Sequence, residues 1–194
     1  TDGAFDHRPV VDGQRLLDPT AFAKGWIIEQ ALLHLLFGGA SSYFVNAGGD
    51  VVVGAPPAGR TSWRVGITHP DDHSAVFATV DLAHAAIATS GTYERGDHIR
   101  STAGEGRHDL TSVSVVGPEL ATADALATAV FAGGRPRPSW WPSGSPYGII
   151  AVVASGGVLF TDNLADVVHV GAHGHTSLHP APSGPNPATG THPH

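Results

Sequence analysis

The strongest constraint on the fold is the order of two long apolar segments and the short β-rich runs around them. The first segment follows Asp18-Pro19, runs through Phe37 and stops at Gly38-Gly39, which predicts a helix with Asp18 as its N-cap. A second helix is predicted over 119–133. The runs between and after them are rich in Val, Ile and Thr and lie at hairpin spacing. This order predicts an α+β domain with helices on an antiparallel sheet.

Length and charge limit the classes of protein to consider. The 194 residues fit one domain, and the net charge of −7 with scattered basic residues argues against binding of nucleic acid. The absence of Cys excludes disulfides and thiolate zinc sites. No stretch approaches the roughly 20 apolar residues of a transmembrane helix. The chain contains no Met, so Thr1 is expected to be a cut within a longer protein or a processed end.

The sequence divides into a domain at 1–167 and a tail at 168–194. The tail is rich in Pro, Gly and His and has no apolar period, so it is expected to be disordered. Its histidines at 169, 173, 175 and 179 could bind a transition metal, but no helix or strand is expected to present them. A solvated tail is therefore favoured over a metal site.

Asp124 and Thr128 are the polar pair that stands out in the second apolar segment. Residues four apart share one face of a helix, so the carboxylate and the hydroxyl point to the same place. Both are hard oxygen donors that suit Mg²⁺, an ion that often takes its other ligands from a substrate phosphate. The alternative places Asp124 in solvent near the helix start and Thr128 in the core. The pair alone favours this alternative.

Three other features of the sequence could serve a function. Lys24 lies on the apolar side of the first helix, where a ligand phosphate or a carboxylate such as Asp18 would serve as its partner. His98 lies in a glycine-flanked loop and is either a general base or a surface residue. The stretch "NAGGD" at 46–50 could approach a ligand, but a turn is favoured. Neither GxxxxGK nor GxGxxG occurs.

Five stretches of residues 1 to about 165 resemble, in order and spacing, the ApbE family of FAD:protein FMN transferases. They read "DPTAFAKGW", "NAGGDVVVG", "WRVGITHP", "AIATSGTYERGDHI" and "SVSVVGPELATADALATAVFAGG". In particular, the chain resembles the short actinobacterial-type members, in which a Lys-Gly-Trp follows the Asp-Pro turn. The resemblance implies a T-fold-like antiparallel sheet packed with helices, and it favours a functional role for Asp124 and Thr128.

The resemblance also implies a set of site residues. Mg²⁺ would lie between the FAD pyrophosphate and Asp124 and Thr128, with the backbone carbonyl of Ala21 as a further ligand. Ala127 stands where some members carry another ligand, and it could offer only its carbonyl. The residues expected to contact FAD are Ala4, Phe5, Asp6, Asp18, Lys24, Ile99 and Arg100.

The reaction implied is transfer of FMN to a threonine hydroxyl of an acceptor protein that carries a motif like Asp/Ser-Gly-x-Thr. The hydroxyl would attack the FMN-side phosphorus of FAD and release AMP, with Lys24 assisting and His98 accepting the hydroxyl proton. Some relatives act outside the cytoplasmic membrane. The cytoplasm is slightly favoured for this chain, because compact members often lack an export signal.

The chain departs from the family pattern in three places. Members usually carry a longer N-terminal region, so part of the FAD pocket is expected to be missing from this sequence, and the segment between "DGAFD" and "DPT" is short. The usual "HIIDPxTG" reads "HIRSTAG". Three outcomes stay open: a compact transferase, an FAD pyrophosphatase that gives FMN and AMP, or a non-catalytic module that binds flavin or another protein.

Overall fold

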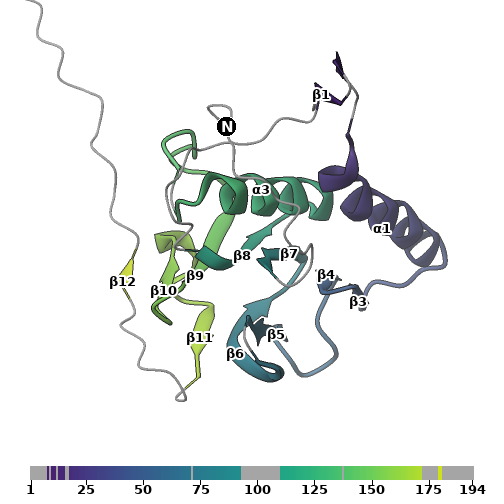
Figure 1. Ribbon diagram of the computed structural model, residues 1–194. Coiled ribbons are helices and arrows are strands. Elements are labelled where there is room, and N and C mark those ends of the chain that lie inside the picture. The colour runs from purple at the N-terminus through teal and green to yellow at the C-terminus, as the bar shows by residue number, and fades with distance from the viewer. Residues whose placement is uncertain are drawn as a thin grey trace, which may run out of the picture.

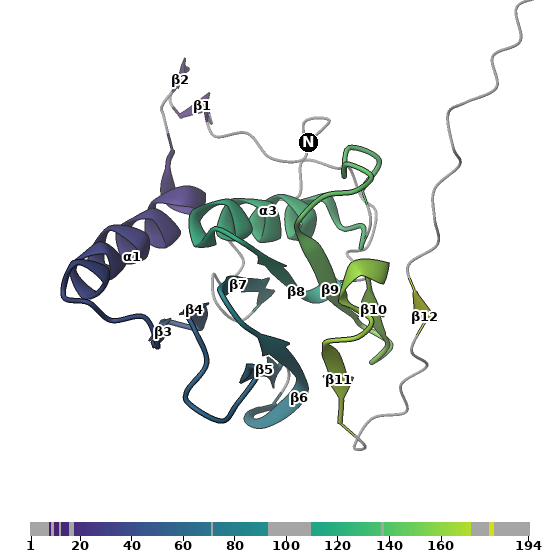
Figure 2. The same ribbon diagram turned by 180° about the vertical axis from the view of Figure 1, so that it is seen from behind.

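Helices and two sheets form three layers in the computed structural model of the protein (Figure 1). The structure describes residues 8, 10–11, 13–15, 18–70, 72–92, 110–136, 138–171 and 179–180. Within these residues, helices α1 (Thr20–Phe37) and α3 (Leu120–Gly133) lie on one face of a seven-stranded sheet. A three-stranded sheet lies on the other face, as the view from behind in Figure 2 also shows.

The large sheet is antiparallel except at one edge, where β10 and β12 run parallel. Its spatial order is β12 (His179–Pro180), β10 (Val158–Phe160), β9 (Gly148–Val153), β8 (Leu110–Gly117), β7 (Ala85–Gly91), β4 (Asp50–Val53) and β3 (Phe44–Ala47). The small sheet has the order β11 (Val168–Val170), β6 (Asp72–Leu82) and β5 (Trp63–His69). The remaining elements are the hairpin of β1 (Val10–Val11) and β2 (Gln14–Arg15) and the short 3₁₀ helix η2 (Asp162–Leu164).

The large sheet separates two apolar cores because side chains alternate between its faces. On β4, Val51 and Val53 pack toward the small sheet, whereas Val52 packs toward the helices. The helix side of β7 carries Ala86 and Ala88, which are fully buried. These small side chains let α3 pack close to the sheet, and ten of the 14 residues of α3 are buried as a result.

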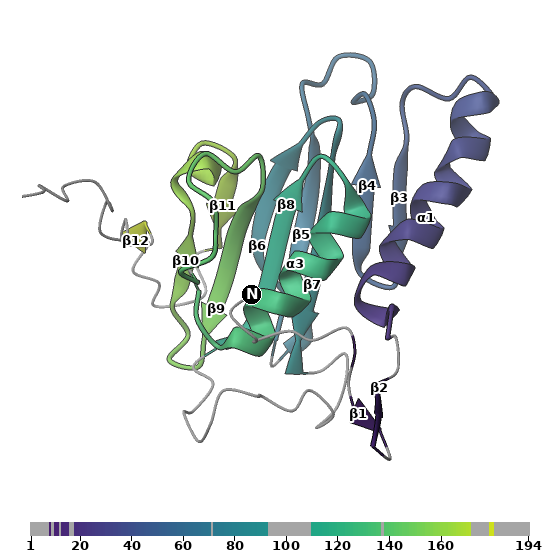
Figure 3. The same cartoon turned by 90° about the horizontal axis from the view of Figure 1, so that it is seen from above.

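The two helices meet where α1 carries a glycine. A Cβ atom on Gly25 would lie 2.6 Å from the Cα of Ala121, so only glycine allows this approach of the two backbones. The view from above shows α1 beside α3 at the edge of the helix layer (Figure 3). Ala21, Gly25, Ile28 and Leu32 form the buried stripe of α1, and the opposite side of this helix is exposed, with Trp26 at 49%.

The structure confirms the α+β class, both helices and the β-rich runs at hairpin spacing. It corrects the start of the first helix, because Pro19 occupies the N-cap position that was predicted for Asp18. Asp18 lies one residue earlier, where its carboxylate accepts hydrogen bonds from the backbone N–H and the hydroxyl of Thr20. The described helices include none that is long and apolar enough to cross a membrane.

The predicted boundary at residue 167 falls too early. Val168–Val170 forms β11 and pairs with β6, so these residues belong to the domain. Asp81 of β6 accepts a hydrogen bond from His169 of β11 at 3.0 Å and two from the guanidinium of Arg64 on β5. The hydrogen bonds from Arg64 are the main reason that the pKa of Asp81 falls to about 2. One carboxylate thus links all three strands of the small sheet.

We expect Gly25→Ala to lower the free energy of unfolding by about 1–3 kcal/mol, because the added methyl group meets the backbone of α3. The cost in packing should be larger than this net change, since it must also outweigh the roughly 1 kcal/mol by which alanine is the better helix former. Urea denaturation measures the change. Gln30→Ala, at an exposed position of the same helix, serves as the control and should stay near wild type. Equal stability of Gly25→Ala and wild type would contradict the packing described here.

Candidate functional site

Asp50 reaches the helix side of the large sheet because of a tight turn. Gly48 and Gly49 join β3 to β4 with φ of 62° and 92°, which is the two-residue turn that favours glycine at both positions. The side chain of Asn46 accepts a hydrogen bond from the Gly49 N–H at 3.1 Å. The turn predicted at "NAGGD" is therefore confirmed, and the alternation along β4 places Asp50 on the same face as Val52.

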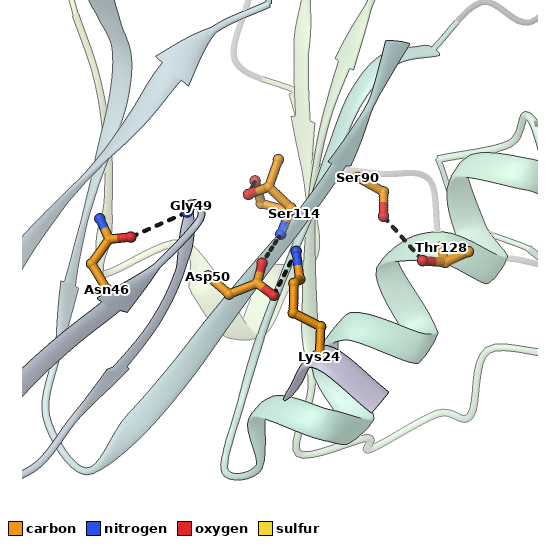
Figure 4. Close-up of polar contacts among 8 residues, drawn as sticks. Lys24, Asn46, Gly49, Asp50, Ser90, Ser114 and Thr128 are labelled. Atoms are coloured by element: carbon orange, nitrogen blue, oxygen red, sulfur yellow. Dashed lines mark hydrogen bonds and ion pairs between the residues drawn. The ribbon is translucent and has the colours of Figure 1, made fainter. Parts of the chain in front are cut away.

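Lys24 of α1 forms an ion pair with Asp50. The distance between Lys24 Nζ and Asp50 Oδ2 is 2.9 Å (Figure 4). The Asp50 side chain is fully buried, whereas the Lys24 side chain is 37% exposed. The other carboxylate oxygen of Asp50 accepts a long hydrogen bond of 3.4 Å from the backbone N–H of Thr89 on β7. The Lys24 side chain is thus held by a carboxylate from a strand while part of it stays exposed to solvent.

Asp124 and Thr128 are both buried residues of α3. Their side chains are 1% and 3% exposed, so the alternative that Asp124 faces solvent is wrong. The hydroxyl of Thr128 lies 3.2 Å from the hydroxyl of Ser90 on β7, as Figure 4 shows. Burial of a carboxylate costs several kcal/mol unless charge or hydrogen bonds compensate. A binding role gives this helix face a reason to keep its polar side chains.

The donors at this helix face fit Mg²⁺ better than zinc. A carboxylate and a hydroxyl are hard oxygen ligands, and Mg²⁺ commonly binds one or two carboxylates and completes its shell with water and phosphate oxygens. Within the part of the chain that the structure describes, no three His, Asp or Glu side chains gather closely enough to form a metal site of their own. A carboxylate and a hydroxyl alone would leave most positions around such an ion to water or to a ligand.

Glu29 of α1 caps the N-terminus of α3. Its Oε1 atom accepts hydrogen bonds from the backbone N–H of Leu120 at 2.5 Å and of Ala121 at 3.2 Å. These amides belong to the first turn of α3, which has no partner for them within the helix. A carboxylate at this end also opposes the positive pole of the helix dipole. The cap fixes α3 to α1 one turn before Asp124.

Asp18 is exposed just before α1, and the remaining predicted site residues divide into two groups. Ala21 belongs to the buried stripe of α1 and is 3% exposed, and Ala127 is fully buried on α3. The carbonyls of Ala21 and Ala127 both lie inside helices, where carbonyls accept backbone hydrogen bonds, so either could bind an ion only in addition to such a bond. The residues that fall outside the described part of the chain are Ala4, Phe5, Asp6, His98, Ile99 and Arg100.

Asp50 and Ser90 also contact residues of the candidate site, although the sequence did not predict them as site residues. Asp50 opens a run of three valines after a glycine turn, and an ionised residue next to such a buried strand was the available signal. Ser90 lies in the strand "AAIATSG" and gave no comparable signal, because serine is common at the ends of strands. Its role depends on the packing of α3 across β7.

Comparisons with known proteins agree on one family. The family model described as the ApbE family matches residues 7–149. The FAD:protein FMN transferase of Vibrio cholerae is 30% identical over 132 residues, which is 62% of this chain and 40% of that protein. The FAD:protein FMN transferase of Treponema pallidum is 32% identical over 134 residues, which is 59% of this chain and 37% of that protein. The chain spans about 40% of the length of these curated relatives.

Solved structures support the same fold. The ApbE protein of Thermotoga maritima has a TM-score of 0.61 and 29% identity, and the match covers 76% of this chain and 51% of that one. The apo form of the Pseudomonas stutzeri flavinyl transferase ApbE has a TM-score of 0.56 and 25% identity, with 79% and 54% covered. The α+β arrangement with antiparallel sheets is therefore the fold of these ApbE structures, over about half of their length.

Glu29→Ala should lower the free energy of unfolding by about 1–2 kcal/mol, because two amides at the start of α3 lose their acceptor. Urea denaturation measures this change. Glu29→Gln is the matched variant, since it keeps an oxygen acceptor and removes only the charge, so its loss should be smaller. If both variants unfolded at the same urea concentration as wild type, Glu29 would not be a cap of α3.

Proposed function

Because the chain belongs to the ApbE family, we propose that it transfers FMN from FAD to a threonine hydroxyl of an acceptor protein, with Mg²⁺ as cofactor. The relatives from Vibrio cholerae and Treponema pallidum are FAD:protein FMN transferases. The observation that carries the proposal is the burial of Asp124 and Thr128 side by side on α3. The hydroxyl of Thr128 faces Ser90 on β7, and the neighbouring Thr89 contacts Asp50, the partner of Lys24.

The bond changes of the reaction are those of a phosphoryl transfer. The acceptor hydroxyl attacks the phosphorus of the FMN half of FAD, a phosphoester bond forms, and the bond to the AMP half breaks. The hydroxyl proton passes to a base, and AMP leaves. When bound, Mg²⁺ supplies positive charge beside the phosphate oxygens. Asp124 and Thr128 would hold that ion, together with the backbone carbonyl of Ala21.

The residues of the chain have separate tasks in this proposal. Lys24 would bind a pyrophosphate oxygen and oppose the negative charge that grows on the leaving phosphate. Asp18, at the start of α1, would orient part of FAD, and the remaining contacts would come from Ala4, Phe5 and Asp6 and from Ile99 and Arg100. His98 would accept the hydroxyl proton. The acceptor threonine would lie in a motif like Asp/Ser-Gly-x-Thr.

We expect Asp124→Asn to abolish Mg²⁺-dependent release of AMP from FAD while the protein still folds. Asparagine has nearly the shape of aspartate but lacks the negative charge that binds the ion. Chromatography of the nucleotides measures AMP, and thermal unfolding with and without Mg²⁺ and FAD measures binding apart from activity. The thermal shift caused by the two ligands in wild type should be lost in the variant.

Asp166→Asn is the matched control. Asp166 is exposed and lies just before β11 of the small sheet, away from α3. It should keep both the AMP release and the thermal shift. Full activity of Asp124→Asn at limiting Mg²⁺ would contradict the metal assignment. Mass spectrometry of an added acceptor separates the transferase from an FAD pyrophosphatase, since only the transferase adds the mass of FMN. AMP release without this addition would favour the pyrophosphatase.

We expect His98→Asn to slow FMN transfer by roughly 10²- to 10⁴-fold, the usual effect of losing a general base. The affinity for FAD should change little, because the contacts of Lys24 and of Asp124 remain. Flavin fluorescence measures the affinity and acceptor mass measures the rate. An unchanged rate would end the catalytic role of His98, and a parallel loss of affinity and rate would make it a residue that shapes the pocket.

A further inference from the structure

Lys24 is the only lysine in the 194 residues, and the other basic residues are all arginines. Its ammonium group pairs at 2.9 Å with Asp50, a residue from a different element 26 positions later in the chain. Lysine presents a compact charge on a flexible stem of four carbons, so its position depends on what holds the ammonium. In this structure a buried carboxylate does so.

The two side chains of the ion pair differ in exposure, which suits a role of Asp50 in positioning Lys24. Asp50 is fully buried, whereas more than a third of the Lys24 side chain is exposed. Removing a carboxylate from water carries a penalty that one ion pair often fails to repay, so such a pair adds little stability compared with apolar packing. What it does provide is a fixed direction for the partner. The buried carboxylate fixes a side chain that is partly exposed, and a ligand would approach Lys24 from this exposed side.

One strand connects this ion pair to the oxygen ligands on α3. The backbone N–H of Thr89 donates to Asp50, and the hydroxyl of the next residue, Ser90, lies 3.2 Å from that of Thr128. Of these two consecutive residues of β7, Thr89 therefore contacts Asp50 and Ser90 contacts Thr128, the second contact being drawn in Figure 4. The polar contacts run from Lys24 through Asp50 and β7 to Thr128, so β7 fixes the cation and the oxygen ligands relative to each other.

We propose that Asp50 is a positioning residue that holds the ammonium group of Lys24 for the pyrophosphate of FAD. This inference rests on the proposed function for the identity of the ligand. Asp50 touches Lys24 rather than the reacting atoms, so it acts through Lys24. Loss of Asp50 should therefore matter for FAD only while Lys24 is present.

A double-mutant cycle tests this dependence. The variants are Asp50→Asn, Lys24→Met and the double variant, and flavin fluorescence measures the dissociation constant of FAD with Mg²⁺. We expect each single variant to bind FAD at least about tenfold more weakly than wild type, as is typical when one partner of a coupled charge pair is removed. The double variant should bind no more weakly than Lys24→Met. Losses that multiply in the double variant would overturn the proposal, as would wild-type affinity of Asp50→Asn.

The rate of chemical modification of Lys24 is a second measurement, and it needs no FAD. An amine reagent can modify one side chain only, and mass spectrometry of the peptide that holds Lys24 gives the rate. We expect Asp50→Asn to raise this rate several-fold, because the ammonium loses the partner that holds it. An unchanged rate would overturn the proposal. If wild type fails to bind FAD, the proposed function fails, and this measurement still decides whether Asp50 holds Lys24.

Asp81→Asn is the matched control. It makes the same chemical change in another ion pair, that of Asp81 with Arg64 on the small sheet, and it should alter neither FAD affinity nor the modification rate of Lys24. Thermal unfolding checks that each variant folds. If Asp50→Asn does not fold, Asp50→Ser removes the same charge with a smaller side chain and takes its place in both measurements.

Discussion

The close contact between α1 and α3 is the interaction on which the rest of the structure depends. Gly25 lets the two backbones approach until a single methyl group would not fit between them. At this distance Glu29 reaches the first amides of α3 and caps them. The contact involves only a few residues, yet it sets where both helices lie on the sheet. The positions of Lys24 on one helix and of Asp124 on the other follow from it.

Small side chains extend this constraint from the helices to the sheet. Alanines on β7 and α3 bring the helix close enough for Thr128 to reach Ser90. Larger residues at these positions would widen the layer and separate the two hydroxyls. The polar groups of the site thus lie in a layer whose thickness is set by apolar packing. This arrangement explains how a domain with few charged residues can hold a carboxylate and an ion pair between helix and sheet.

The sequence predicted the local parts of the site better than the contacts within it. Asp124 and Thr128 were recognised as one pair because residues four apart share a helix face. For Lys24 the sequence suggested a phosphate or Asp18, and the structure supplies Asp50. The first helix begins one residue later than its capping signal suggested. The sequence predicted a disordered tail where the structure has β11. Three residues beside a segment rich in Pro and Gly are too few to show the apolar alternation of a strand.

The sequence by itself determined the elements, their order and the family, because periodicity, turn residues and motifs are properties of neighbouring positions. It determined the glycine turn before Asp50 for the same reason. Only the tertiary structure decided which elements meet. Asp50 and Lys24 pair, Ser90 meets Thr128, and Glu29 caps a helix 91 positions away, because the strand order puts β4 beside β7 and the helices cross above them. Such contacts depend on packing between elements, which no local pattern records.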